Sequence, residues 1–363
     1  MSLVKKCLTA LKDILMDKKH LIIDSRPYGF FSIFLHTIDN LKWAEDNGYE
    51  PYIRWGSGRV DVNSARPGAE EATRKGHPKF VGDEPNFFEP DYKGEIKDSL
   101  YYSLEGYNGS TNVWEYYFHP VGNSEAENSE HKVSEIFQVG FHDLDLDSLT
   151  EKFLIYNLHS YTPLNLWLYF RADPESESIA PTKQSIFLNH RKRVHHYIEK
   201  YVVPKKEIMK KIEDFTSQYF TDSVIGVHVR GTDKGSESKI GQRPYVTVDH
   251  YLNVLEKTLK TFPKSSIFVA SDNNEAIARI FKKFRNNKII VYNCTRMKTY
   301  DSIIPVHLSS QSGPKAGEEA LIDCLLLSKC NHIICTDSNL SAAALYFNPD
   351  VTCTFINNHL ENR

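Results

Sequence analysis

The second half of the chain alternates between short apolar runs and longer segments with helical periodicity. The apolar runs lack the strict alternation of a half-exposed strand, so they predict strands that are buried on both faces. These runs are SVIGVHV (223–229), SIFVAS (266–271), KIIVYN (288–293), HIICT (332–336) and VTCTFI (351–356). The segments between them predict helices at 246–262, 273–284, 317–329 and 338–347. Strands separated by helices in this way predict a doubly wound α/β domain with a parallel sheet.

A strand, a helix and a second strand are also predicted between residues 20 and 55. The run LIID predicts the first strand, and apolar residues then recur at helical spacing from Phe34 to Leu41. Asn47-Gly48 marks the end of the helix, and PYIRW predicts the second strand. Such a βαβ unit implies a parallel sheet, with the loop SRPYGFF at its carboxyl edge, where ligands bind. Residues 56–90 are polar and rich in Gly and Pro, which predicts a long insertion.

Two patterns between residues 111 and 148 have a structural and a functional interpretation. The run TNVWEYYFHPVG (111–122) gathers four aromatic residues around Glu115. Clustered aromatic side chains are more often core than site, so we expect a core segment. Asp143-Leu144-Asp145 matches the DxD pattern that metal-dependent glycosyltransferases use. Alternating Asp and Leu also suits a surface turn before a helix, and we favour that interpretation.

A basic, amphipathic stretch runs from Asn189 to Phe220 and is interrupted at Pro204. Its periodicity predicts two helices, which we interpret as a connector between domains with solvated lysines. Nucleic-acid binding is the alternative, but the stretch has no interleaved groove of aromatic residues to support it.

Composition limits the classes of function. The chain has 363 residues, a length that favours two domains. Apolar residues make up 40% and charged residues 25%, as in globular proteins. The 44 Lys and Arg nearly balance the 47 Asp and Glu, for a net charge of -3. We therefore expect no nucleic-acid partner and no attraction to an acidic membrane, so any anionic ligand must be held by a local cluster.

The six cysteines show no CxxC or zinc spacing and mostly lie in apolar runs. They are typical of reduced, packed thiols and indicate a reducing compartment. The first twenty residues lack a signal-peptide core, and no uninterrupted apolar stretch is long enough to span a membrane. We therefore expect a cytoplasmic protein without a membrane span.

Polar clusters follow three of the predicted strands in the second half. They are HVRGTDK (228–234), SDNN (271–274) and TDSN (336–339). Because the carboxyl ends of parallel strands meet at one edge of a sheet, we expect the three clusters to converge there.

Arg230 and the helix that follows the third cluster are the candidate anion ligands. An arginine can clamp a phosphate with two parallel hydrogen bonds. Ser338 and Asn339 lie at the predicted helix start, where free backbone N–H groups and the helix dipole favour an anion. Structural alternatives exist, because Ser and Asn are common N-caps and Asp233 can neutralise Arg230 or His228.

In combination, these groups suggest a diphosphate that lies between Arg230 and the helix start. Asp272 or Asp323 could then accept hydrogen bonds from a base or a ribose. The chain has neither a GxGxxG nor a GxxxxGK[ST] loop and no metal-ligand constellation, so hydride transfer and P-loop chemistry lack support. A nucleotide diphosphate as leaving group is the best chemical interpretation, with Arg230 and the helix end in place of a metal.

Several motifs resemble those of a known superfamily of fucosyltransferases. VHVRGTDK resembles the first motif of the superfamily that includes the α1,6-fucosyltransferases of N-glycan core and nodulation type, with the protein O-fucosyltransferases as distant relatives. IFVASDNN is similar to the second motif, and LIDCLLLSKCNHIICTDSNLSAAALYF to the third. GFFSIFLHTIDNLKWAEDNGYEPYIRW and NVWEYYFHP look like N-terminal elements of the same group. The resemblance covers most of the chain in patches.

The resemblance implies an α/β, GT-B-like fold of two Rossmann-type domains with parallel sheets. Residues 1–200 would form the N-terminal acceptor-side domain, and residues 201–363 the C-terminal nucleotide-sugar-binding domain. The implied enzyme is a glycosyltransferase that transfers fucose from GDP-fucose to a glycan acceptor by inverting displacement. No metal and no cofactor are implied.

Roles for single residues follow from the same resemblance. Arg230 would hold the β-phosphate, His228 would lie beside the nucleoside, and Asp323 would read guanine. Ser338 and Asn339 would support the phosphates. Family positions tied to activity fall on Asp233, Lys234 and Asp272.

The chain departs from the family pattern at three of these motif positions. Gly231 replaces the second arginine of the α1,6 enzymes, Asp337 replaces an aromatic residue, and Leu340 replaces a glutamine. These departures leave open a transferase for another nucleotide sugar, or a nucleotide- or carbohydrate-binding protein that has lost catalysis.

The general base is assigned to Glu237. Inverting transfer needs a carboxylate or its equivalent near the acceptor hydroxyl. Glu237 matches the family position only after a shift of one residue, since Ser238 stands in register. Glu115 and Asp233 are the substitutes that we consider.

Overall fold

The computed structural model describes residues 19–24, 29–55, 60–61, 96–97, 112–122, 134–136, 153–156, 181–231, 246–298, 313–336 and 338–356. The chain divides into two compact units, Met1–Tyr28 with His36–Pro163 and Gly29–Leu35 with Leu164–Arg363. The boundary at residue 200, which separates an acceptor-side domain from a nucleotide-sugar domain by function, stays a prediction.

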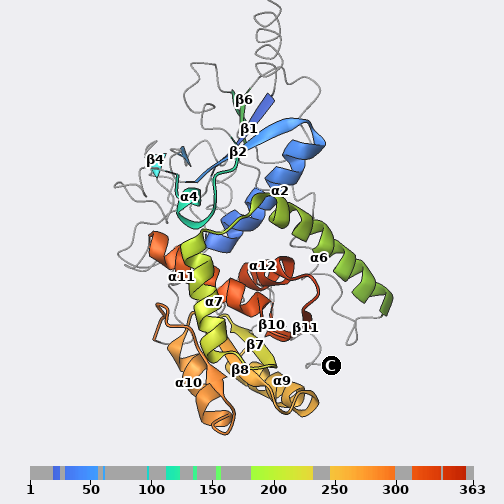
Figure 1. The fold of residues 1–363 in the computed structure, drawn as a ribbon, viewed down its shortest axis with the longest axis vertical. Coiled ribbons are helices and arrows are strands. Elements are labelled where there is room, and N and C mark those ends of the chain that lie inside the picture. The colour runs from blue at the N-terminus through green and yellow to red at the C-terminus, as the bar shows by residue number, and fades with distance from the viewer. Residues whose placement is uncertain are drawn as a thin grey trace, which may run out of the picture. The chain divides into compact units, whose positions relative to one another are not determined.

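The first unit contains a four-stranded parallel sheet in the order β2-β1-β6-β5, of which Figure 1 labels β2, β1 and β6. Its strands are β1 (Lys19–Asp24), β2 (Tyr49–Arg54), β5 (Ser134–Ile136) and β6 (Phe153–Tyr156). Helix α2 (Phe30–Asp46) leads from β1 to β2, so the predicted βαβ unit is confirmed. A short antiparallel pair joins β3 (Val60–Asp61) to β4 (Ile96–Lys97), and the rest of the predicted insertion lies outside the described residues.

The aromatic segment forms part of the core, as predicted. Helix α4 (Trp114–Tyr117) buries Trp114 and Tyr117, and Phe118 after it is also buried. The rings of Trp55 and Trp114 meet edge to face with centroids 5.0 Å apart, a geometry that aromatic pairs favour. The Asp143-Leu144-Asp145 pattern lies outside the described residues.

Gly122 lets this segment approach the edge of β2 closely. Its φ is +82°, and a Cβ atom at this position would lie 2.2 Å from the carbonyl oxygen of Pro51. One residue earlier, the Val121 carbonyl accepts a hydrogen bond from the backbone N–H of Ile53 at 3.3 Å. Only glycine combines this backbone angle with so close a contact.

The second unit contains two helices from the basic stretch, α6 (Pro181–Tyr201) and α7 (Lys206–Tyr219). The interruption near Pro204 is therefore confirmed. The interpretation of α6 as a solvated connector is incomplete, because Arg191 is buried. Its Nη1 donates hydrogen bonds to the carbonyls of Pro349 (3.1 Å) and Val351 (2.8 Å). The guanidinium thus donates hydrogen bonds to backbone carbonyls in the short segment that follows the last helix and precedes the last strand of the described chain.

The predicted doubly wound domain is confirmed in the second unit. Its sheet is parallel, with the order β11-β10-β7-β8-β9. The strands are β7 (Val224–Val229), β8 (Ser266–Ser271), β9 (Ile289–Ile290), β10 (His332–Cys335) and β11 (Thr352–Phe355). The connecting helices are α9 (Val248–Thr261), α10 (Asn274–Lys283), α11 (Pro314–Ser328) and α12 (Asn339–Phe347).

Strand β9 is shorter than the predicted strand 288–293. The guanidinium of Arg296 donates hydrogen bonds to the carbonyls of Tyr292 and Cys294. Side-chain hydrogen bonds of this kind take carbonyls that a longer strand would offer to its neighbour. The chain therefore leaves the sheet after Ile290.

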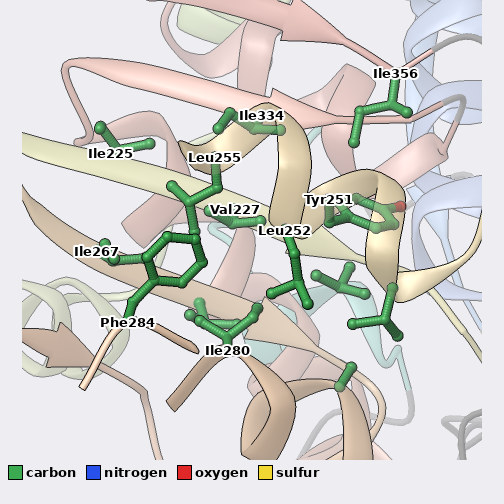
Figure 2. Close-up of a cluster of buried hydrophobic side chains, with 14 of the residues drawn as sticks. Ile225, Val227, Tyr251, Leu252, Leu255, Ile267, Ile280, Phe284, Ile334 and Ile356 are labelled. Carbon is green, nitrogen blue, oxygen red and sulfur yellow. The ribbon is translucent and has the colours of Figure 1, made fainter. Parts of the chain in front are cut away.

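The core of this domain lies where α9 and α10 pack against one face of the sheet. Figure 2 shows Tyr251, Leu252 and Leu255 of α9 gathered beside the strand residues Val227 and Ile334. Burial of each such aliphatic side chain contributes about 1.5–3 kcal/mol to stability. The core is close-packed up to the carboxyl ends of the strands, so it fixes where the following loops begin.

Helix α11 covers the opposite face. A Cβ atom at Gly226 in β7 would lie 2.9 Å from both Leu327 Cδ2 in α11 and Cys330 Sγ just after it. The small glycine therefore lets α11 approach β7 closely.

Candidate functional site

The strand order of the second unit reverses between β7 and β10. From β7 the chain proceeds through β8 to β9 on one side, and it then returns to β10 and β11 on the other. Ligands of open parallel α/β sheets bind outside the carboxyl ends of the strands at such a switch point. The segments after β7 and β10, which contain Arg230 and Ser338, therefore flank the candidate site.

The carboxyl end of β7 is connected to α12 by a buried hydrogen bond. His228 Nδ1 lies 2.6 Å from Ser341 Oγ in the first turn of α12. Arg230 follows β7 directly and is half-buried, and Gly231 after it is buried. The strand thus carries Arg230 at the carboxyl edge of the sheet, two residues after His228, which contacts the first turn of α12.

Asp272 connects the loops that follow β7 and β8. Its Oδ1 accepts a hydrogen bond from the backbone N–H of Gly231 at 3.1 Å. The neighbouring Asn273 caps α10, because its Oδ1 accepts a hydrogen bond from the backbone N–H of Ala276 at 2.9 Å. Two of the three predicted clusters therefore meet through Asp272.

Tyr251 of α9, which no sequence pattern indicated, also contacts this edge of the sheet. Its hydroxyl lies 3.1 Å from Thr336 Oγ1, which follows β10, and also hydrogen-bonds with the backbone of Arg230. Burial raises the pKa of Tyr251 well above its ordinary value, so the hydroxyl stays protonated at neutral pH. Tyr251 thus joins the two segments that flank the switch point.

The start of α12 presents backbone N–H groups without a side-chain cap. Ser338 occupies the N-cap position, but its side chain makes no capping hydrogen bond, and Asn339 is the first residue of the helix. The first N–H groups of a helix lack intrahelical partners and form the positive end of its dipole. Together with the Arg230 guanidinium, this helix end is suited to bind a group with two or more negative charges.

Asp323 lies in α11 and is only 6% exposed. Its Oδ2 contacts Cys294 Sγ at 3.5 Å, and its Oδ1 is buried without a hydrogen-bond partner among the described residues. Burial raises the pKa of Asp323 to about 7, although Arg296 and the Cys294 thiol oppose this effect. Among the described residues, its hydrogen-bond partner is Cys294, which lies on the segment after β9.

Glu115 lies in α4 of the first unit and is half-buried. Its Oε1 accepts a hydrogen bond from Asn112 Nδ2 at 3.3 Å. The other predicted residues after β7 and β10 lie outside the described residues: Asp233, Lys234, Glu237, Ser238 and Asp337. Their roles stay predictions.

Four residues of this region were not predicted from the sequence: Arg296, Cys294, Ser341 and Tyr251. A sequence signal exists for the first two. Arg296 and Cys294 follow a strand, as Arg230 does, so the rule that polar residues after strands face the ligand edge would have found them. Ser341 and Tyr251 carried no such signal. Each lies within a predicted helix, and only the packing of that helix shows what its hydroxyl contacts.

The described cysteines are all free thiols: Cys294, Cys324, Cys330, Cys335 and Cys353. Burial raises the pKa of the Cys294, Cys324, Cys330 and Cys353 thiols, which keeps them protonated at neutral pH. The prediction of packed thiols is confirmed for Cys324, Cys330 and Cys335, which are buried, and the reduced state stays a prediction. Within the described stretches, every helix is too short or too polar to cross a membrane.

One family model matches part of the chain. Residues 180–342 match the family model of alpha-(1,6)-fucosyltransferase N- and catalytic domains. No curated protein sequence matches the chain.

Solved structures resemble the chain over most of its length. Fucosyltransferase NodZ from Bradyrhizobium is 14% identical with a TM-score of 0.50, covering 91% of this chain and 92% of that chain. NodZ alpha-1,6-fucosyltransferase co-crystallized with GDP is 14% identical with a TM-score of 0.50, covering 94% and 96%. POFUT1 in its apo form is 11% identical with a TM-score of 0.45, covering 94% and 98%. At these identities the NodZ matches concern the fold alone, and they confirm the predicted GT-B-like α/β class.

Proposed function

We propose that this chain is a glycosyltransferase of the fucosyltransferase superfamily, whose family model matches residues 180–342, that its donor is GDP-fucose and that its acceptor is a glycan. We further propose that the reaction is an inverting single displacement that needs no metal ion. The transfer of fucose follows from the family, and the donor, the stereochemistry and the metal independence are the proposal.

The observation that carries the proposal is the convergence of Arg230 and the start of α12 at the switch point. The His228–Ser341 hydrogen bond (2.6 Å) and the Asp272–Gly231 hydrogen bond (3.1 Å) hold this edge together. A leaving nucleoside diphosphate gains negative charge on its β-phosphate as the bond to the sugar breaks. Groups fixed in place before the reaction stabilise that charge without reorganisation, which lowers the barrier.

The proposed transfer is a single displacement that involves neither a change of oxidation state nor a metal ion. The acceptor hydroxyl oxygen attacks C1 of fucose while the bond from C1 to the β-phosphate oxygen breaks, so the configuration at C1 inverts. The electron pair of that bond leaves with GDP, and the acceptor proton passes to a carboxylate. Glu237 is the proposed base, with Asp233 and Glu115 as substitutes.

The other assigned residues bind the donor in this proposal. Arg230 holds the β-phosphate, and Ser338 and Asn339 contact the phosphates through the helix start. Asp323 accepts hydrogen bonds from guanine, and this role is supported by its buried Oδ1, an acceptor that has no hydrogen-bond partner among the described residues. His228 lies beside the nucleoside. Contributions to donor binding are also assigned to Lys234 and Asp272.

Metal independence is supported by the charge that the chain itself supplies. The Arg230 guanidinium and the positive end of α12 can together offset the charge that a divalent ion would neutralise. We also propose a cytoplasmic location, which the free, protonated thiols support.

The test is calorimetric titration with GDP and with UDP, with EDTA present throughout, followed by a transfer assay with GDP-fucose and a panel of glycans. We expect GDP alone to bind, and we expect the product to carry inverted anomeric configuration by NMR. Arg230→Ala should abolish transfer while the thermal unfolding curve stays as in the unmodified chain. Tight binding of UDP instead of GDP would overturn the donor assignment, and GDP binding that EDTA abolishes would overturn metal independence.

A further inference from the structure

Residues 292–297 follow β9 and form hydrogen bonds both with the end of β8 and with α11; this segment is called the 292–297 loop. Arg296 Nε donates a hydrogen bond to the carbonyl of Ser271 at 3.0 Å. The backbone N–H of Met297 donates to the carbonyl of Asp272 at 2.8 Å. The loop is thus fixed to the segment that holds the Gly231 backbone through Asp272.

The same loop is fixed to α11 by two carboxylates. Glu319 Oε2 accepts a hydrogen bond from the backbone N–H of Thr295 at 2.7 Å. One turn further along the helix, Asp323 Oδ2 lies 3.5 Å from Cys294 Sγ. Both carboxylates lie on the side of α11 that faces the loop. The two contacts therefore fix the position of the loop relative to the helix.

Arg296, Cys294 and Asp323 form a chain of hydrogen bonds. Arg296 Nη2 donates to Cys294 Sγ at 3.0 Å, and the Cys294 thiol donates to Asp323 Oδ2. Donation to the sulfur polarises the S–H group, so each bond strengthens the next. This series of hydrogen bonds occupies Oδ2 of the carboxylate and leaves the buried Oδ1 without a hydrogen-bond partner in the part of the chain that the structure describes.

We propose that Cys294 and Arg296 are positioning residues for Asp323: they orient the carboxylate and favour its ionised form, so that Oδ1 is available to a donor group of the nucleotide base. This inference rests on the proposed function for the identity of the ligand. The coupling between Cys294 and Asp323 does not depend on it.

Electrostatics support this arrangement. Burial and the nearby Glu319 carboxylate raise the pKa of Asp323 to about 7, whereas Arg296 and the Cys294 thiol lower it. The pKa of Cys294 is itself raised, mainly by burial, so its thiol is a donor at neutral pH. The other titratable groups next to Asp323 among the described residues are Tyr292 and Cys324, whose pKa values are also raised and which stay neutral. Asp323 therefore changes charge near neutral pH, and the thiol affects the pH at which it does so.

The experiment is a 13C NMR titration of aspartate carboxyl carbons in the nucleotide-free full chain, from about pH 5 to about pH 9. Asp323→Asn identifies the signal. We expect Cys294→Ala to move the midpoint upward by about 0.5–1 pH unit, because the ionised form loses a hydrogen bond. Cys294→Ser keeps a donor and should restore the midpoint to the original value or below. Arg296→Gln should move it upward as well.

Cys330→Ala is the matched control. The Cys330 thiol is buried and donates to the carbonyl of Leu326 at 3.5 Å, so its removal opens a similar cavity without touching a carboxylate. It should lower the unfolding temperature and leave the Asp323 midpoint unchanged. An unchanged midpoint in Cys294→Ala, or an equal shift in Cys330→Ala, would overturn the positioning role.

GDP titration over the same pH range tests the ligand. We expect GDP affinity to fall below the Asp323 midpoint, and we expect this fall to begin at higher pH in Cys294→Ala. If GDP fails to bind at every pH while the NMR midpoint still moves, the proposed function fails and the positioning role stands. If GDP binds with the same pH profile in both proteins, the claim that this carboxylate receives the base is refuted.

Discussion

Removal of the Tyr251 hydroxyl should weaken both the fold and the candidate site. Tyr251→Phe keeps the buried ring but deletes the group that joins Thr336 Oγ1, 3.1 Å away, to the backbone of Arg230. A buried polar group left without its partner costs about 1–3 kcal/mol. The threonine hydroxyl can rotate toward another acceptor, so we expect a loss near the middle of that range, about 2 kcal/mol.

The measurements are thermal unfolding and GDP titration. For a domain of this size, a loss of about 2 kcal/mol lowers the Tm by roughly 5 °C. Because the hydroxyl also fixes the backbone that carries Arg230, we expect GDP affinity to fall about fivefold, which corresponds to about 1 kcal/mol.

Tyr219→Phe is the control, because Tyr219 in α7 is 40% exposed. Removal of an exposed hydroxyl should change stability by less than about 0.5 kcal/mol and leave GDP affinity unchanged. The reasoning is refuted if Tyr251→Phe unfolds and binds GDP as the unmodified chain does. A loss of stability without a change in GDP affinity would show that the Tyr251 hydroxyl contributes to the stability of the core and not to GDP binding.

Three further predictions follow from single contacts. Arg230→Lys keeps the charge but loses the two-pronged geometry, so transfer from GDP-fucose should slow by about 100-fold or more, and near-normal turnover would contradict the clamp. Gly122→Ala should destabilise the chain by about 3 kcal/mol or more in urea unfolding, because its Cβ would meet the Pro51 carbonyl oxygen at 2.2 Å. Gly48→Ala, with a similar positive φ but open space around it, should cost only about 1 kcal/mol, and equal losses would show that the contact is unimportant. Because the pKa of Asp323 rises from 3.8 to about 7 on folding, the folded chain binds more protons in that window and its stability falls as the pH rises through it. Asp323→Asn should flatten this fall when urea unfolding is compared at about pH 5 and about pH 8, and an unchanged slope would contradict the raised pKa.

The elements themselves were readable from the sequence because their signals are local. An apolar run without alternation, such as SVIGVHV, is buried on both faces in any parallel sheet, and it became β7. Helix ends followed the same logic, since Asn273 caps α10 through its own side chain. The rule that polar residues after strands face a ligand edge then pointed to Arg230, Asp272 and Ser338 as candidates.

Where local and tertiary signals differed, tertiary contacts decided the outcome. The predicted strand 288–293 ends after Ile290 because Arg296 binds the Tyr292 and Cys294 carbonyls. The solvated connector expected at α6 contains the buried Arg191, because carbonyls far along the chain need its donors. A short stretch of sequence shows the charge of a side chain, but it does not show the distant hydrogen-bond acceptor that offsets the free-energy cost of burying that charge.

The sequence by itself determined the class of fold, the order of strands and helices along the chain, and the residue types at the ends of the strands. Only the tertiary structure decided that β10 lies beside β7, and therefore which loops meet. The contacts that define the site join residues 41 positions apart (Gly231 and Asp272), 85 apart (Tyr251 and Thr336) and 29 apart (Cys294 and Asp323). Such contacts depend on strand order and helix packing, which arise from the whole core at once, so no local pattern of residues encodes them.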